Sequence, residues 1–142
     1  MKKTRHAQNT LPHSLGELEL RVMASVWRSP GIEAKQVQEK LAQRQHSSLS
    51  TIQSTLERLV RKGLLDREKR GHAFGYTACV SRAELLGRLL KDVIGLLHDG
   101  NPDTILSSFV NAASRIDNTA LDQLEQMIQH KRRQQTQEQD DD

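Results

Sequence analysis

The fold is decided by residues 48–77, SLSTIQSTLERLVRKGLLDREKRGHAFGYT. Ser48 has the side chain of a helix N-cap, and Gly63 stands where a left-handed C-cap is wanted, so we predict a helix between them. The apolar period then changes from helical to alternating, which predicts two short strands at residues 65–70 and 73–77. This stretch therefore predicts a helix followed directly by a β-hairpin.

Two further helices are predicted upstream. The first begins at a capping box that starts with Ser14, and the second is a short amphipathic helix over residues 33–43. Three helices followed by a basic hairpin predict a winged helix-turn-helix domain at residues 14–80. We expect residues 1–13 to be a flexible basic arm. The fold class is mainly α with a small β-hairpin wing.

The remaining chain predicts a helical dimerisation domain at residues 81–133 and a disordered tail at 134–142. Its first helix, 82–98, has apolar residues on more faces than one small domain can cover, and such a surface typically marks an interface. The expected dimer contacts are Leu86, Leu89, Leu90, Val93, Leu97, Ile105, Phe109, Leu124 and Ile128.

Charge is distributed unevenly along the chain. The net charge is +3, but residues 1–80 carry 14 Lys and Arg against 7 Asp and Glu, whereas residues 81–142 carry 7 against 11. The N-terminal part is therefore expected to face a polyanion, and double-stranded DNA is the polyanion that a winged helix fits.

The predicted DNA contacts lie on the helix of residues 48–62 and on the hairpin. At 100° per residue, polar and basic side chains of that helix gather opposite its apolar stripe, on a face expected to carry no acid. A glutamine at its flank suits adenine, and the arginines suit phosphates. The candidates are Ser50, Thr51, Gln53, Ser54, Arg58, Arg61 and Lys62 on the helix, and Lys69, Arg70 and His72 on the hairpin. Ordinary surface roles, such as an Arg58 to Glu57 pair, remain open for each.

Other functional classes fit less well. The histidines have no metal-ligand spacing and no phosphate-binding loop is present, so neither a catalytic site nor a cofactor nor a metal is expected. Cys79 is alone and is expected to be a small buried residue, while Phe74 and Tyr76 are expected to fill the core of a domain too small to enclose a ligand. Without an apolar run long enough for membrane insertion, the protein is expected in the cytoplasm. A winged-helix module for protein or RNA remains the alternative.

Three segments resemble the penicillinase-repressor family of bacterial regulators, the BlaI/MecI/CopY type: residues 18–23, residues 51–65, and Tyr76 before Val80-Ser81-Arg82. The resemblance implies a winged-helix domain, a helical dimerisation domain and repression at palindromic operators. It also implies release by a membrane sensor in the antibiotic-resistance branch and by metal in the copper branch. The paired Cys-x-Cys motif of the copper branch is absent, so copper sensing is not expected. The Asn-Phe bond that is cut in the sensor-linked branch is matched here by Ser108 and Phe109, which keeps only the Phe.

Overall fold

The computed structural model describes residues 15–141, so the predicted basic arm and the Ser14 cap lie outside the described residues. The chain is mainly helical with one small sheet, as predicted. Its elements are, in order, α1 (Glu17–Arg28), β1 (Ile32–Glu33), α2 (Ala34–Leu41), α3 (Leu49–Arg61), β2 (Leu65–Arg70), β3 (Ala73–Ala78), α4 (Arg82–Leu97), α5 (Pro102–Ser114) and α6 (Ala120–Asp140).

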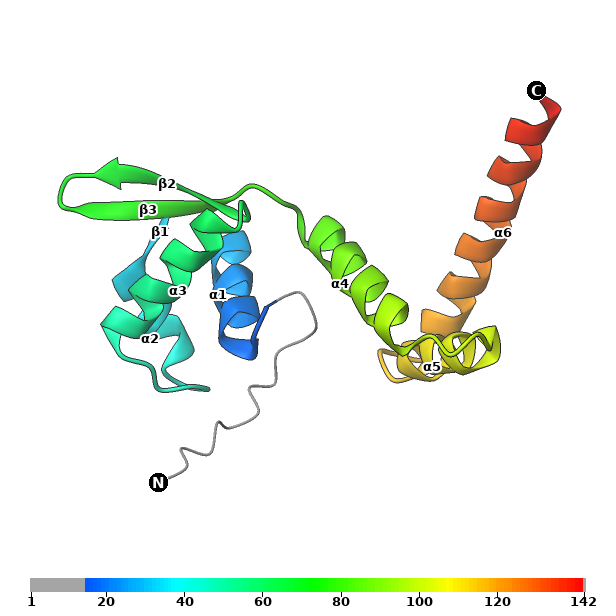
Figure 1. Ribbon diagram of the computed structural model, residues 1–142, viewed down its shortest axis with the longest axis horizontal. Helices are drawn as coiled ribbons and strands as arrows, with labels where there is room; N and C mark the ends of the chain where they lie inside the picture. Colours follow the sequence, from blue (N-terminus) through cyan, green and yellow to red (C-terminus); the bar gives the residue numbers. More distant parts are fainter. Residues whose placement is uncertain (1–14, 142) are drawn as a thin grey trace. The chain divides into compact units, whose positions relative to one another are not determined.

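The first three helices and the sheet form a winged helix-turn-helix unit, which confirms the predicted fold. Figure 1 shows α1, α2 and α3 together on one side of the β2–β3 ribbon. The helix caps follow local chemistry: Ser48 Oγ accepts the Thr51 N–H at 3.2 Å, and Gly63 has a φ of 75°. The start of α1 differs from the prediction, since its N-cap is Gly16, whose N–H donates to the Glu19 carboxylate.

The sheet has a third strand that the sequence pattern did not predict. β1 pairs antiparallel with β3, giving the order β1-β3-β2, and the Gly31 N–H donates to the Tyr76 carbonyl at 2.8 Å. A two-residue strand is too short for an alternating pattern to be recognised. The approach is so close that a Cβ on Gly75 would lie 2.8 Å from the Gly31 carbonyl oxygen, so only glycine fits there.

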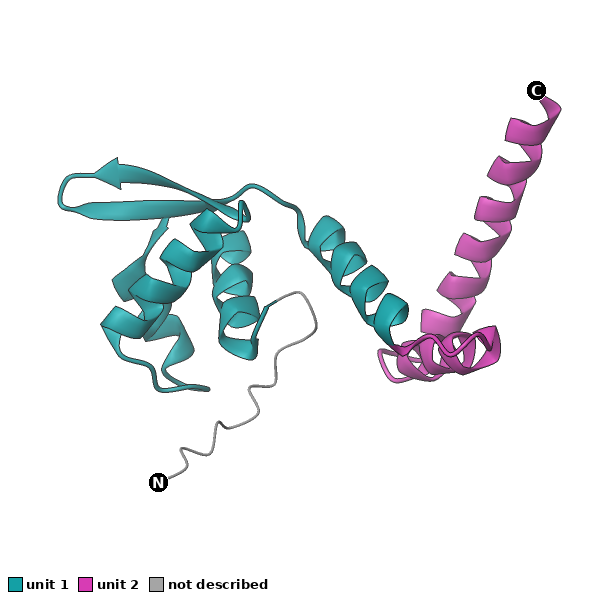
Figure 2. Cartoon of the chain, viewed as in Figure 1, with its two compact units in different colours: residues 1–96 teal, residues 97–142 magenta. Residues whose placement is uncertain are grey.

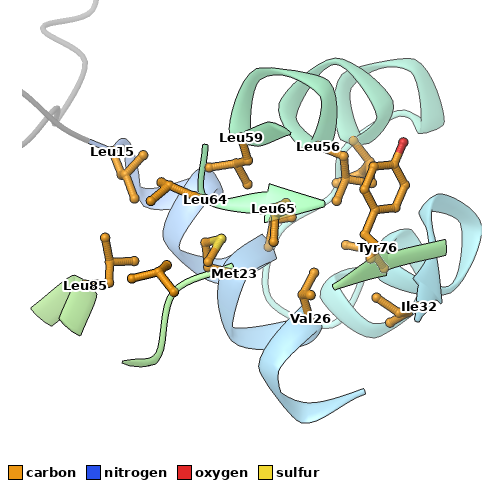
Figure 3. Packing of buried hydrophobic residues seen from close by; sticks show 14 of the residues in the cluster. Leu15, Met23, Val26, Ile32, Leu56, Leu59, Leu64, Leu65, Tyr76 and Leu85 are labelled. Carbon is orange, nitrogen blue, oxygen red and sulfur yellow. The ribbon is translucent and has the colours of Figure 1, made fainter. Parts of the chain in front are cut away.

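The core of this unit is aliphatic, with one aromatic ring. Figure 3 shows Met23 and Val26 of α1 packed near Leu65 and Tyr76 of the sheet. The buried cluster comprises Leu15, Val22, Met23, Val26, Ile32, Val37, Leu41, Ile52, Leu56, Leu59, Leu64, Leu65, Tyr76, Val80 and Leu85. Phe74 is 37% exposed and does not join it, because its ring, near the turn of the hairpin, packs under the Arg67 guanidinium instead; the prediction of a core role for Phe74 is wrong.

α4 is packed onto the winged unit at its N-terminal end. Leu85 is 4% exposed and lies near Leu15 in the core (Figure 3). Leu89 packs against the same cluster. The connection is held by the Trp27 indole, which donates to the Val80 carbonyl at 2.9 Å and lies under the Arg82 guanidinium. The two compact units accordingly divide between Leu96 and Leu97, whereas the sequence pattern placed the boundary after Val80 (Figure 2).

The second unit, residues 97–142, contains α5 and α6. α5 begins as predicted, with Pro102 in its first turn and the Asn101 side chain accepting the Asp103 N–H at 3.0 Å. α6 continues to Asp140, so the prediction of disorder is wrong for residues 134–140. That segment has no Gly or Pro to end the helix, and its Gln and Glu side chains favour helical backbone. Among residues 15–141, no helix combines the length and the apolarity needed to cross a membrane.

Candidate nucleic-acid interface

α3 presents the predicted set of polar and basic side chains to solvent. Ile52, Leu56 and Leu59 are fully buried, and the opposite face is exposed. That exposed face brings together Ser50, Thr51, Gln53, Ser54, Arg58, Arg61 and the adjoining Lys62. Their contact with DNA stays a prediction.

The side chains of this face differ in whether they are already hydrogen-bonded within the protein. The hydroxyls near the N-terminus bond locally: Ser48 Oγ lies 2.8 Å from Thr51 Oγ1, and Ser54 Oγ donates to the Ser50 carbonyl at 2.9 Å. By contrast, Gln53 and Arg61 have no side-chain partner among the described residues. An amide and a guanidinium without partners are available for a ligand that carries acceptors and donors.

Arg58 and Lys62 are tied to α1 through a carboxylate that the sequence pattern did not single out. Glu19 is only 7% exposed and lies 2.8 Å from Lys62 Nζ and 3.8 Å from Arg58 Nη1. Both cations remain partly exposed. Glu19 therefore holds the C-terminal end of α3 on α1 and offsets part of the positive charge assigned to phosphate binding.

The exposed face of α3 does carry an acid, which corrects the prediction of an acid-free face. At 100° per residue, Glu57 lies within about 20° of Ser50 on the helix surface. The signal was thus present in the sequence, in the position of Glu57 around the helix. The structure pairs Glu57 with the wing: Oε2 accepts from Arg67 Nη1, and Oε1 accepts from the Tyr76 hydroxyl at 3.0 Å.

Tyr76 has its ring in the core and its hydroxyl directed at α3 (Figure 3). Burial, then the hydrogen bond to Glu57 and its charge, raise the pKa of Tyr76 to about 12, while Arg67 opposes the shift. The phenol is therefore a proton donor to Glu57 throughout the physiological range.

The basic residues of the wing point to two faces of the hairpin. Arg67 and Lys69 share the face of Leu65, and the Arg67 guanidinium lies 4.6 Å from the centre of the Phe74 ring. Arg70 lies on the other face, where its guanidinium covers Gly31 and its Nε covers Gly75. Lys69 and His72 are exposed near the turn. The predicted set of basic side chains at the tip is therefore divided.

One other prediction about chemistry is corrected by the structure. Cys79 is exposed, so its expected burial is wrong: it follows β3, where the chain leaves the sheet. Among residues 15–141, no group of three or more His, Cys, Asp or Glu side chains could hold a metal ion.

The winged unit also has an open depression of about 630 Å³ between α1 and α2. Arg21, Arg28, Lys40 and Arg44 are among its lining residues. This charged lining differs from the mainly apolar lining of pockets that enclose small ligands.

The predicted dimer contacts divide between exposed and packed positions. Leu86, Leu90, Leu97, Phe109 and Ile128 are exposed, and Val93, Ile105 and Leu124 are half-buried. Leu89 differs, because it packs on the core of the winged unit. The candidate cleavage pair, Ser108 and Phe109, lies within α5, where Ser108 Oγ donates to the Thr104 carbonyl at 2.7 Å.

Comparison with known proteins gives one family and several relatives. The family model described as Penicillinase repressor matches residues 15–130. The chain is 25% identical over 120 residues to the penicillinase repressor of Bacillus licheniformis, covering 84% of this chain and 93% of the relative. It is 32% identical over 98 residues to the transcriptional regulator BlaI of Mycobacterium tuberculosis, covering 68% of this chain and 71% of the relative. A solved structure of Bacillus licheniformis BlaI, monomeric and in complex with the blaP half-operator, matches at 32% identity and a TM-score of 0.43, covering 53% of this chain and 90% of that one.

Proposed function

Because the chain belongs to the penicillinase repressor family, we propose that it represses transcription by binding a palindromic DNA operator as a homodimer. Relatives bear the names penicillinase repressor, methicillin resistance regulatory protein MecI and transcriptional regulator BlaI. The proposed reader of DNA sequence is α3, placed in the major groove, with the wing against the backbone.

The observation that carries the DNA-binding proposal is the exposed face of α3. Gln53 and Arg61 are unpartnered there among the described residues, and the acid on this face, Glu57, is compensated by Arg67. A glutamine amide can pair with both acceptor and donor of adenine in the major groove, and arginine binds phosphate or guanine. Base readout is assigned to Gln53, and backbone contact to Arg61 and Lys69.

The proposed homodimer rests on an apolar stripe along α4. Leu86, Leu90, Val93 and Leu97 recur at the alternating spacing of a two-helix seam. Leu86 is 54% exposed and Leu97 75%, so much of the stripe is left uncovered by residues 15–141. A second copy covers it, together with exposed residues of α5 and α6, and would place two recognition helices on half-sites about 34 Å apart or a multiple of that distance.

Derepression is proposed to occur by loss of this dimer. Losing the link between two half-sites removes an effective-concentration gain of roughly 10² to 10⁴, without changing any base contact. A protease or a membrane sensor acting upstream is the proposed trigger. Cleavage at Ser108 requires local opening of α5, because the bond lies inside a hydrogen-bonded helix.

The DNA-binding proposal is tested by selecting duplexes from a random pool with the full chain. We expect an enriched pseudo-palindrome, two protected half-sites in a footprint, and affinity that falls steeply with salt yet survives competitor DNA. Preferential binding of RNA of the same composition, or failure to enrich any sequence, would instead support the protein- or RNA-interaction alternative.

The dimer proposal is tested by cutting the chain after Ser108. The shortened protein should keep its sequence preference while binding the selected palindrome at least ten times more weakly. If it binds as tightly as the intact chain, loss of the C-terminal helices is not the mechanism of derepression.

A further inference from the structure

One carboxylate joins the recognition helix to both strands of the wing. Glu57 projects from α3, and its two oxygens contact Arg67 on β2 and Tyr76 on β3. We propose that Glu57 is a positioning residue, which fixes the wing relative to α3 so that both engage one duplex. This inference rests on the proposed DNA-binding function and adds to it a determinant of affinity that does not itself touch DNA.

The contacts of Glu57 are placed so that they connect α3 to the β2–β3 hairpin. Arg67 and Tyr76 are register partners across the hairpin, so the carboxylate holds a facing pair of residues. Tyr76 is 3% exposed and also pairs with Ile32 of β1, which anchors this point of the hairpin in the core. The Arg67 guanidinium also lies over the Phe74 ring. The remainder of the hairpin, toward Gly71, extends from this anchored point.

The negative charge of Glu57 allows a positioning role to be distinguished from a simple effect of charge on DNA affinity. An acid on the α3 face that meets DNA repels phosphates, so charge alone predicts tighter binding when it is removed. A positioning role predicts weaker binding when Glu57 is removed, because the wing is then no longer held in a fixed position relative to α3. The sign of the change in affinity therefore separates the two explanations.

The experiment compares Glu57→Ala with Glu57→Gln in the full chain. The probes are a duplex selected from a random pool by the wild-type protein and a scrambled duplex of equal length. For Glu57→Ala we expect about fivefold weaker binding to the selected duplex, as suits a partly exposed ion pair, and a smaller loss on the scrambled one. Glu57→Gln should restore binding, because its carbonyl accepts from Arg67 and its amide donates to the Tyr76 oxygen.

Glu68→Ala is the matched control, since it removes the same charge from the hairpin that Glu57 contacts, at an exposed site where the Arg70 guanidinium is 3.9 Å away. It should strengthen binding to both duplexes equally. If Glu57→Ala does the same, or if Glu57→Gln binds as weakly as Glu57→Ala, the positioning role is refuted. Failure of the wild-type chain to select any duplex would instead refute the proposed function.

Tyr76→Phe covers the case in which Glu57→Ala does not fold. It keeps the ring in the core and removes only the hydroxyl that contacts Glu57. We expect unchanged half-site protection in the major groove and weaker hydroxyl-radical protection of the backbone where the wing lies. Unchanged protection at both places would overturn the proposal.

Discussion

Replacing Gly75 by Ala should destabilise the winged unit through a backbone clash. The added Cβ would lie 2.8 Å from the Gly31 carbonyl oxygen and 3.3 Å from Arg70 Nε. The arginine side chain can move, but the carbonyl belongs to the turn that leads into β1, so β1 must separate from β3. We expect the free energy of unfolding to fall by about 2 kcal/mol, which is typical of overpacking at a close contact.

For a unit of this size, that change lowers the midpoint of thermal unfolding by about 10 °C. Circular dichroism measures it, with all variants at one protein concentration because a proposed dimer makes the midpoint concentration-dependent. The matched control is Gly95→Ala in α4, where nothing lies within 4 Å of the added Cβ. There, the better helix propensity of Ala should stabilise by about 0.5 kcal/mol. Equal midpoints for Gly75→Ala and wild type would refute the close approach of β1 and β3.

Three further predictions follow from the site and the packing. Tyr76 is the single tyrosine, and its pKa is raised from 10.0 to about 12. The contribution of Tyr76 to stability should therefore be constant below pH 10 and fall by up to about 2 kcal/mol between pH 10 and 12, as the unfolded chain releases the proton first. Tyrosinate absorbance with a midpoint near 10 in still-folded protein would contradict this. Gln53→Ala should relax preference at one base position by roughly 1 to 3 kcal/mol, measured by repeating the duplex selection, whereas an unchanged preference would remove Gln53 from base readout. Leu90→Asp should give folded monomers in sedimentation, and tight dimers of this variant would contradict the proposed dimer contact along α4. Leu89→Asp should instead lower the thermal midpoint of the winged unit, because Leu89 packs on its core.

The parts of the fold that the sequence predicted are those determined by local chemistry. Ser48 and Gly63 set the ends of α3 from adjacent residues, and Asn101 with Pro102 does the same for α5. The alternation after Gly63 is likewise a local pattern, so the hairpin could be placed nearly residue by residue.

The parts that the sequence did not predict depend on distant contacts. β1 exists because a backbone segment of two residues meets β3 far along the chain, and no side-chain pattern encodes so short a strand. The Glu19 to Lys62 pair spans 43 positions along the chain. The local pattern assigns Lys62 to phosphate binding, whereas the structure pairs its ammonium group with a carboxylate of α1. Similarly, Leu85 has the spacing of an α4 interface residue but is buried in the winged core, since only tertiary packing decides which face of α4 that core takes.

Because the start of α4 is packed into the core of the winged unit, the rotation of this helix about its own axis is fixed. Trp27 and Leu85 fix where the helix starts and how it is turned about its own axis, so the angular position of Leu90 around α4 is fixed relative to α3. One residue inserted between Leu89 and Leu90 would rotate the later part of the proposed seam by about 100° and advance it by about 1.5 Å. In the proposed dimer, the phase between two operator half-sites would then depend on the number of residues in a helix outside the proposed DNA-binding surface.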